Sequence, residues 1–441
     1  MGLLIGVGQT RPQFAYDYYY GIEWDVTVSN PKPTRIGKME LHQSLPIQSL
    51  MRRCILNDDG SVNYYLNANN SALRDNSAAA TLDGSHGQVM VEIPDMYVRF
   101  ERDGNKCRCF ISDQPLPGFI KWAKSYISAY EATIDRTVSG TFKLASVVNT
   151  TPEFRGGANT GAEIAHDADG GTSLGKPSTN VSLTNFRDYA RNRGAEWNCN
   201  TYQSQVKLWW LFAVEYANFN SQDTFIGELT GEGFRQGGLG AGVTDLVAGN
   251  ITAMTGGTYS CIPCGITNEL GNKTGIVAYA MPSEYGSAKT TDVPSYRGVE
   301  NPFGHLWKWT DGCKCLIQAD GDGGLSELYV CDDPTKFTSS GVADYELRGN
   351  LPREEGYIKE VILGEYGEIM PLSIGGGSTT YFCDRFYTSI PASGVAERGV
   401  LFGGHASSGA SAGFVYSHTS YAASTAAAAI GSRLCFIPGV A

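Results

Sequence analysis

Glycine content places the strongest restriction on the fold of this chain. The sequence has 441 residues, of which 54 are glycine, against ~7% in average proteins, and the glycines follow no Gly-X-Y repeat. Glycine supports tight turns and close approaches of the backbone, but it destabilises the interior of helices. We therefore predict a fold rich in strands and loops. Because 42% of the residues are hydrophobic and 11% are aromatic, this fold can bury a large core.

Local patterns predict an α+β protein with two domains. Asp-Gly pairs mark hairpin turns between alternating segments in the first quarter of the chain, which indicates a β-rich domain over residues 1–120. Helical spacing appears later, in a short segment with Thr184 as its expected N-cap and in a longer apolar segment over residues 202–219. The second domain is expected over residues 121–441.

Charge and hydropathy exclude several classes of partner. The net charge at pH 7 is −11, and no cluster of Lys and Arg offers a site for nucleic acid. Insertion into a membrane is not expected, because no apolar run reaches the ~18 residues of a spanning helix. A secretory signal has a basic region before its apolar stretch. The short apolar stretch at the start of this chain has no basic residue before it. The eleven cysteines are an odd number without a disulfide framework, which favours free and mostly buried thiols.

The segment over residues 398–436 has an unusual composition. Its charged residues are Arg398 and Arg433, and it contains no Lys, Gln, Glu, Met, Trp, Asn, Asp or Pro. One interpretation is a low-complexity Ala/Ser tail. However, the segment begins with GVLFGG and ends with IGSRLCF, and both read as buried strands. We favour an ordered frame around a small, uncharged insert that carries aromatic residues.

Motifs for catalysis and metal binding are weak. Cys261 and Cys264 form a CxxC pair without a second pair or histidines at zinc spacing, and no GxSxG motif or compact Ser/His/Asp arrangement is present. Asp167 and Asp320 lie in glycine-containing turns that lack a complete calcium-binding loop. We expect that the protein is not an enzyme and that it binds no metal or other cofactor. The alternative that remains open is a calcium ion bound in one of these turns.

Two histidines lie within the uncharged insert. His405 and His418 are accompanied by Tyr416 and Tyr421, so this group could hold a metal or form a contact surface for another molecule. The contact surface fits better, because no acidic residue accompanies the histidines.

Four segments, in order, resemble a known family. They are YISAYEATI at residues 126–134, a helix that ends in WWLFAVEYANFNSQ, YRGVENPFGHLWKWTDG at residues 296–312, and the RGVLFGG…IGSRLCF frame at residues 398–436. The sequence over about residues 126–436 resembles the C-type lectin fold of the formylglycine-generating-enzyme type. Within that fold it resembles variable proteins of diversity-generating retroelements, such as phage tail receptor-binding proteins of the major-tropism-determinant kind. The segment TRIGKMELHQSLPIQSLMRRCILNDDG is weakly similar to the N-terminal part of variable proteins from gut phages and prophages.

The resemblance implies an origin for the unusual composition. Retroelements of this family copy a template with an error-prone reverse transcriptase that randomises adenines, mostly in AAY codons. Such codons cannot become Lys, Gln, Glu, Met or Trp, and the insert lacks all five.

The family also implies a function. The chain would be a phage or prophage receptor-binding protein with a hypervariable surface that binds a host cell-surface receptor, either a protein or a glycan. It would be made in the bacterial cytoplasm and built into the virion, at the tail tip or a tail fibre, with other phage tail proteins. Residues 1–120 would attach or oligomerise the chain, and by analogy with the family we expect a homo-oligomer, preferably a trimer.

Two other functions on the same fold remain as alternatives. The first is a formylglycine-generating-type oxidase that acts on a peptide cysteine, which requires a reactive, copper-binding cysteine pair. Cys383 and Cys435 are the candidates, and neither lies in a matching motif. The second is a cell-surface adhesin, which the lack of a signal peptide disfavours.

The resemblance implies two sets of site residues. Small and aromatic side chains in the insert would contact the ligand, with the affinity centred on the aromatic and histidine members from position 414 onward: His405, Ser407, Ser408, Ser411, Phe414, Tyr416, His418, Ser420 and Tyr421. Residues 422–429 would contribute little in this copy. The frame would hold the backbone in place while the side chains vary, through Gly403, Gly404, Gly409, Gly413, Gly431 and Arg433.

Overall fold

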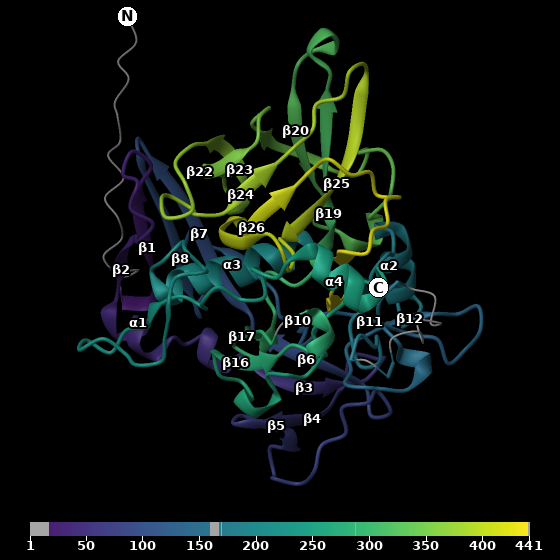
Figure 1. Ribbon diagram of the computed structural model, residues 1–441. Coiled ribbons are helices and arrows are strands. Elements are labelled where there is room, and N and C mark those ends of the chain that lie inside the picture. The colour runs from purple at the N-terminus through teal and green to yellow at the C-terminus, as the bar shows by residue number, and fades with distance from the viewer. Residues whose placement is uncertain (1–16, 159–166, 169, 287, 440–441) are drawn as a thin grey trace, which may run out of the picture.

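The computed structural model describes residues 17–158, 167–168, 170–286 and 288–439. Within these ranges the protein is α+β, and strands clearly predominate over helices (Figure 1). The helices are short apart from the third: α1 (Met39–Ser44), α2 (Leu183–Arg191), α3 (Tyr202–Tyr216) and α4 (Ala248–Thr255). The predicted predominance of strands and loops is confirmed. No helix in the described ranges is long and apolar enough to cross a membrane.

Two sheets contain the N-terminal strands. The first has five strands in the order β2-β1-β8-β7-β9: β1 (Tyr20–Asp25), β2 (Thr34–Gly37), β7 (Met96–Asp103), β8 (Lys106–Ser112) and β9 (Ile120–Trp122). The second has seven strands in the order β13-β28-β10-β6-β3-β4-β5: β3 (Arg52–Leu56), β4 (Val62–Asn67), β5 (Asn70–Arg74), β6 (Gln88–Ile93), β10 (Ser125–Ser128), β13 (Trp197–Cys199) and β28 (Leu434–Phe436).

A nine-stranded sheet contains most of the C-terminal part. Eight strands follow the order β21-β20-β19-β25-β26-β24-β22-β23, and β27 pairs with β19. Their bounds are β19 (Trp307–Gln318), β20 (Ser326–Val330), β21 (Glu346–Asn350), β22 (Gly356–Leu363), β23 (Glu368–Ile374), β24 (Arg385–Tyr387), β25 (Val395–Gly403), β26 (Gly413–His418) and β27 (Ile430–Gly431).

The remaining strands form small sheets. These are β11 (Thr133–Asp135) with β12 (Lys143–Ala145), β14 (Phe225–Ile226) with β15 (Gln236–Gly237), and β16 (Gly275–Ala280) with β17 (Thr290–Tyr296) and β18 (Val299–Glu300).

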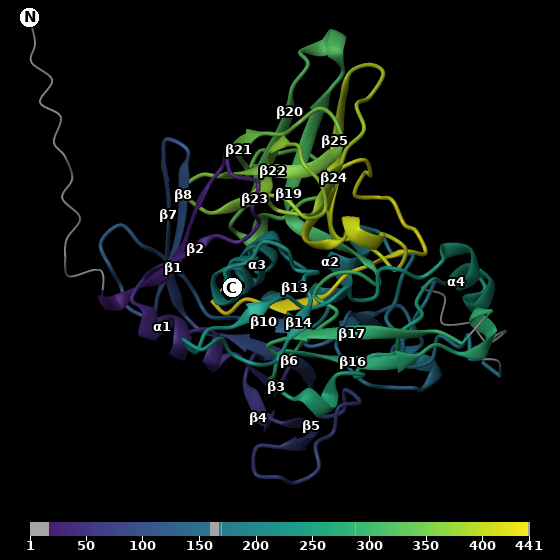
Figure 2. The same cartoon turned by 60° about the vertical axis from the view of Figure 1, so that its left-hand side comes forward.

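Helix α3 occupies the centre of the protein, between the seven-stranded and the nine-stranded sheets (Figure 2). It begins at the N-cap Thr201, whose hydroxyl accepts a hydrogen bond from the backbone N–H of Ser204 at 3.2 Å. Almost all of its side chains are buried, including Trp209 and Phe212, whose rings stack with centroids 5.9 Å apart. A helix that is buried on every side must be covered on every side, and α3 also packs against β1 of the five-stranded sheet, where the centroids of the Trp24 and Trp210 rings lie 5.7 Å apart.

Helix α2 differs from the prediction at both ends. Its N-cap is Ser182, whose hydroxyl accepts a hydrogen bond from Asn185 N–H at 3.2 Å, and the expected cap Thr184 lies in the first turn. The Thr184 hydroxyl instead hydrogen-bonds the Ser339 hydroxyl at 2.7 Å, a contact between distant parts of the chain that local sequence does not reveal. The helix ends at Arg191, three residues before Gly194, which the sequence pattern predicts as its stop.

The largest hydrophobic core extends across the boundary expected at residue 120. Its buried members run from Tyr20 to Phe436. In the seven-stranded sheet, β6 pairs with β10 through Glu92 and Tyr126, and β10 pairs with the C-terminal β28. Strands from both expected ranges therefore share one sheet and one core.

Candidate ligand-binding surface

The uncharged segment forms two adjacent strands and a long connection across the surface (yellow in Figures 1 and 2). Strands β25 and β26 pair antiparallel, with Leu401 opposite His418, and a 3-10 turn, η8 (Gly409–Ser411), lies between them. The chain then passes through residues 419–429 and returns as β27, which pairs in parallel with β19. The final strand β28 belongs to the other large sheet. Both ends of the segment are thus anchored in the core.

Backbone hydrogen bonds to other parts of the chain hold the segment. Each joins a backbone N–H to a carbonyl oxygen, with one partner inside the segment and one outside it: Ala406 N to His305 O (2.9 Å), Leu246 N to Ala406 O (2.7 Å), Gly409 N to Thr244 O (2.6 Å), Thr419 N to Tyr387 O (2.9 Å), Leu183 N to Ala423 O (3.0 Å) and Asn180 N to Ala427 O (3.0 Å). Since no side chain of the segment takes part, these bonds persist when its side chains change.

Glycines occupy the positions where the segment turns and approaches its support. Gly403, Gly404 and Gly409 have positive φ angles of 99°, 78° and 56°, a region that other residues rarely adopt. Gly431 lies buried in β27. Gly413 is required for a different reason, because a Cβ there would lie 1.9 Å from the Oδ1 atom of Asp384.

Asp384 supports the start of β26 from below. Its carboxylate is buried and accepts a hydrogen bond from Val415 N–H at 2.8 Å. Burial raises the pKa of this carboxyl well above its usual range. Gln222 supports the preceding turn through its side-chain amide, which donates to the carbonyl oxygens of Gly409 and Ala412 at 3.1 and 2.6 Å. The sequence offered no local signal for Asp384, whereas Gln222 is the last residue of the WWLFAVEYANFNSQ segment that carries the resemblance.

Arg433 lies beneath the surface and is buried. Its guanidinium donates to the carbonyl oxygens of Ser128 at 3.1 Å, of Asn301 at 2.6 Å, and of Glu300. Burial lowers the pKa of this guanidinium. Through these bonds Arg433 ties the last strand to β10 and to the chain that leads into β19.

Aromatic rings gather where the segment reaches the surface. The His418 imidazole is stacked between two tyrosine rings, with centroids 4.6 Å from Tyr387 at an interplanar angle of 19° and 4.8 Å from Tyr421 at 20°. The Tyr416 ring lies 4.5 Å from Trp307. We call these five residues the aromatic cluster. It combines large apolar faces with phenolic hydroxyl and imidazole nitrogen atoms.

The two histidines of the segment are neutral at pH 7. Burial lowers the pKa of His405 and of His418 to about 4. His405 Nδ1 lies 3.0 Å from the Tyr259 hydroxyl and 3.2 Å from the Ser407 hydroxyl, so this ring is part of a hydrogen-bonded group rather than a free cation.

The predicted contact residues differ in exposure. Tyr421 is 38% exposed, whereas Tyr416 is buried, with 9% of its surface exposed. The other predicted positions except Phe414 are half-buried: His405, Ser407, Ser408, Ser411, His418 and Ser420.

Phe414 is not a contact residue, and this part of the prediction is wrong. Its side chain is fully buried, with the ring centroid 5.2 Å from Phe212 of α3 and 5.8 Å from Phe303. The alternation of β26 does not reveal this burial, because helix α3 covers the face of the strand that Phe414 occupies. Phe414 therefore anchors the surface to the core.

Sequence reasoning missed three aromatic residues that lie outside the segment. Trp307 belongs to the ENPFGHLWKW element, which was recognised as a mark of the fold and not as part of a site. Tyr387 and Tyr259 carry no local signal. Parallel pairing of β24 with β26 places Tyr387 opposite His418, and Tyr387 is 37% exposed. Tyr387 thus joins the residues of the segment at the surface, whereas Trp307 and Tyr259 are buried beneath it.

The carboxylates considered for calcium have partners within the chain. Asp167 receives two hydrogen bonds from the Arg155 guanidinium, at 2.8 and 2.7 Å, and Asp320 pairs with Arg353 at 2.6 Å. His166 and Asp169, which belong to the first of these turns, lie outside the described residues. In the described part of the chain, no three His, Cys, Asp or Glu side chains are grouped as metal ligands.

All eleven cysteines are free and buried. Burial raises the thiol pKa of Cys383 and of Cys435, the residues considered for an oxidase. A raised pKa disfavours the thiolate, which is the reactive form and the form that binds metals.

Comparisons with known proteins leave the chain without a family assignment. No protein-family model matches the sequence, and no curated protein matches it. Among solved structures, that of PvdO from Pseudomonas aeruginosa covers 81% of this chain and 99% of that chain, at 9% sequence identity and a TM-score of 0.30. A likeness of this size assigns neither a fold nor a function.

Proposed function

We propose that this chain is a tail-associated receptor-binding protein of a phage or prophage. In this proposal it has a C-type lectin fold of the formylglycine-generating-enzyme type, and a diversity-generating retroelement varies the side chains of residues 405–429. The resulting surface binds a receptor, a protein or a glycan, on the host cell. The protein acts by binding and not as an enzyme.

The observation that carries this proposal is the way in which the segment is held. Its backbone is bonded to backbone atoms elsewhere in the chain, from Asn180 to Tyr387. Exposed side-chain substitutions on such a support typically change the free energy of unfolding by less than ~0.5 kcal/mol. A surface that must vary without unfolding the protein requires this arrangement, and its composition follows the codon rule of the family.

The aromatic cluster supports binding as the activity of the surface. Tyrosine and histidine offer amphipathic contact area and have few rotatable bonds, so little conformational entropy is lost when a partner binds. The stacking of His418 between Tyr387 and Tyr421 restricts these rings before any ligand arrives. Pre-ordering of this kind reduces the entropic cost of association.

The test is to sequence the gene deeply in a population grown from a single clone. We expect substitutions to concentrate at half-buried and exposed positions between His405 and Ala429, at adenines of a linked template repeat. We expect none at Phe414 or Arg433, whose side chains the core requires, and none at Gly413, where the core leaves no room for a side chain. A profile that is flat along the gene would overturn the proposal. Copper content and oxidation of a cysteine-containing peptide would then test the oxidase.

Assembly into the virion is tested separately. We propose that residues 1–120 attach the chain to other tail proteins and form a homo-oligomer, a trimer by analogy with the family, because several weak sites gain affinity when they bind together. Light scattering on the purified chain measures the oligomeric state, and mass spectrometry of purified particles detects the protein. A monomer that is absent from particles would contradict this part of the proposal and would favour the adhesin.

A further inference from the structure

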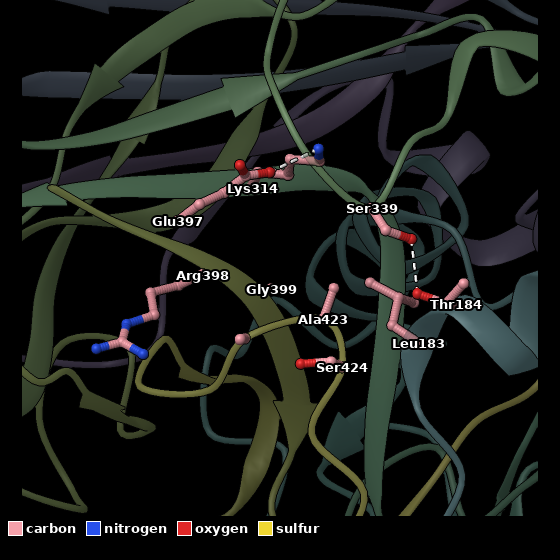
Figure 3. A pocket seen from close by; sticks show the side chains of 10 residues that line it. Leu183, Thr184, Lys314, Ser339, Glu397, Arg398, Gly399, Ala423 and Ser424 are labelled. Atoms are coloured by element: carbon pink, nitrogen blue, oxygen red, sulfur yellow. Dashed lines mark hydrogen bonds and ion pairs between the residues drawn. The ribbon is translucent and has the colours of Figure 1, made fainter.

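A cavity of about 250 Å³ opens beside the variable segment (Figure 3). One wall consists of Ala422, Ala423 and Ser424, and Leu183 of helix α2 lies beside Ala423 in the lining. Lys314 of β19 and residues 397–399 of β25 also line the cavity. The volume is smaller than the ~300–1,000 Å³ of sites for drug-sized molecules, so the cavity suits one small chemical unit.

Backbone bonds on both sides fix the alanine wall. Gly399 N–H donates to Tyr421 O at 2.9 Å, and Leu183 N–H donates to Ala423 O at 3.0 Å. Because these bonds do not involve side chains, the wall stays in place whatever residue occupies position 422 or 423. The methyl side chains of this copy leave the cavity open, whereas larger side chains would fill it.

An unpaired cation lies at the rim of the cavity. Among the arginines that the structure describes, Arg398 is the one without an ion pair or hydrogen bond, and its Nε atom is buried without a partner. Figure 3 shows its side chain extending away from Glu397 and Lys314. A guanidinium in this state offers paired N–H donors to a carboxylate or phosphate.

The other charges of the cavity neutralise each other. Lys314 Nζ lies 2.8 Å from Glu397 Oε1, and the second carboxylate oxygen accepts Gly341 N–H at 2.9 Å. The Ser424 hydroxyl faces the cavity from the opposite wall. The lining therefore combines donors and acceptors, with one net positive charge at Arg398.

We propose that this cavity binds the acidic unit of a saccharide, a pyranose ring that carries a carboxylate. The proposal rests on the proposed receptor-binding function and names a ligand class for one part of that surface. The ring hydroxyls both donate and accept, as Glu397 and Ser424 require, and the carboxylate pairs with Arg398. A bare anion would meet the Glu397 carboxylate without a hydrogen to donate to it, and a neutral sugar would leave Arg398 unpaired.

The test uses the full chain and four small probes: methyl glucuronide, the methyl glycoside of N-acetylneuraminic acid, methyl glucoside and inorganic phosphate. Saturation-transfer NMR and calorimetric titration measure binding. We expect saturable binding of at least one acidic sugar, at least tenfold tighter than that of methyl glucoside. Phosphate is expected to compete weakly.

Two pairs of variants locate the binding. Ala423→Leu fills the cavity and should abolish binding, whereas Ala426→Leu adds the same volume at an exposed position of the same connection and should not. Arg398→Gln should weaken binding about tenfold or more, as expected for loss of a charge-assisted hydrogen bond. Arg102→Gln removes the same charge from β7 and should have no effect. Melting temperatures of all four variants confirm that they fold.

Several results would overturn the assignment: no binding of either acidic sugar, equal binding of methyl glucuronide and methyl glucoside, phosphate as the tighter ligand, or a signal that survives Ala423→Leu. These results are separable from failure of the proposed function. Clonal variation over residues 405–429 without acidic-sugar binding rejects the cavity assignment alone, whereas a flat profile rejects the diversified surface regardless of the sugar result.

Discussion

Replacing Gly413 with alanine should destabilise the protein strongly, although the substitution adds a single methyl group. The new Cβ would lie 1.9 Å from Asp384 Oδ1 and 2.4 Å from both Cγ and Oδ2, far inside contact distance. The carboxylate is buried and bonded to Val415 N–H, so it cannot move without losing that bond. Overpacking costs ~1–3 kcal/mol, and leaving a buried hydrogen-bonding group without its partner costs ~1–3 kcal/mol. We expect a loss of about 3 kcal/mol or more.

Gly409→Ala is the matched control. A Cβ at Gly409 has no atom within 4 Å, and the φ of 56° is its sole strain, which costs ~1–2 kcal/mol. Urea and thermal unfolding of both variants measure the difference. Asp384→Ala removes the colliding atoms, so in the double variant the added cost of Gly413→Ala should fall by at least 2 kcal/mol, a coupling typical of residues in contact. Equal costs for the two glycines, or additive effects of Gly413→Ala and Asp384→Ala, would refute the reasoning.

Three further predictions concern the surface itself. Because the pKa values of His405 and His418 are about 4 in the folded protein, against ~6.5 when unfolded, the unfolded chain binds more protons between these values. Their contribution to stability is therefore complete above pH 6.5 and falls as the pH drops to about 4, by up to ~3 kcal/mol for each histidine. Unfolding titrations of the double variant H405N/H418N should show a shallower pH dependence, and an unchanged slope would contradict the assignment. Phe414→Ala should lower the free energy of unfolding by ~3–5 kcal/mol, because it truncates a core residue. Tyr421→Ala should change the melting temperature little but weaken adsorption to host cells. Similar unfolding of the two variants would contradict this distinction between a core residue and a surface residue. Tyr387→Ala should weaken adsorption at least tenfold, as truncation of a contact residue does, and unchanged adsorption would remove Tyr387 from the surface.

Local features of the sequence predicted the local features of the fold. The glycine content predicted turns and strands, because glycine acts on the backbone at its own position. The apolar spacing over residues 202–219 predicted the helix that the structure shows as α3, because helical periodicity is a property of neighbouring residues. The N-cap of α2 was assigned two residues too late, since Ser182 and Thr184 are both good capping residues. The contact of Thr184 with Ser339 depends on a distant loop.

The candidate binding surface was likewise predicted in part from the sequence and decided in part by the tertiary structure. Composition alone identified the uncharged segment, because the absence of charge is visible without any contact, and the resemblance to the family implied its glycine frame. Pairing between distant strands decided the rest. It brought Trp307 and Tyr387 to His418, placed Asp384 under Gly413, and joined both expected domains in one sheet. It also placed Phe414 against α3. Strand alternation records which side chains share a face, but the elements that pack on that face decide which of them reach solvent.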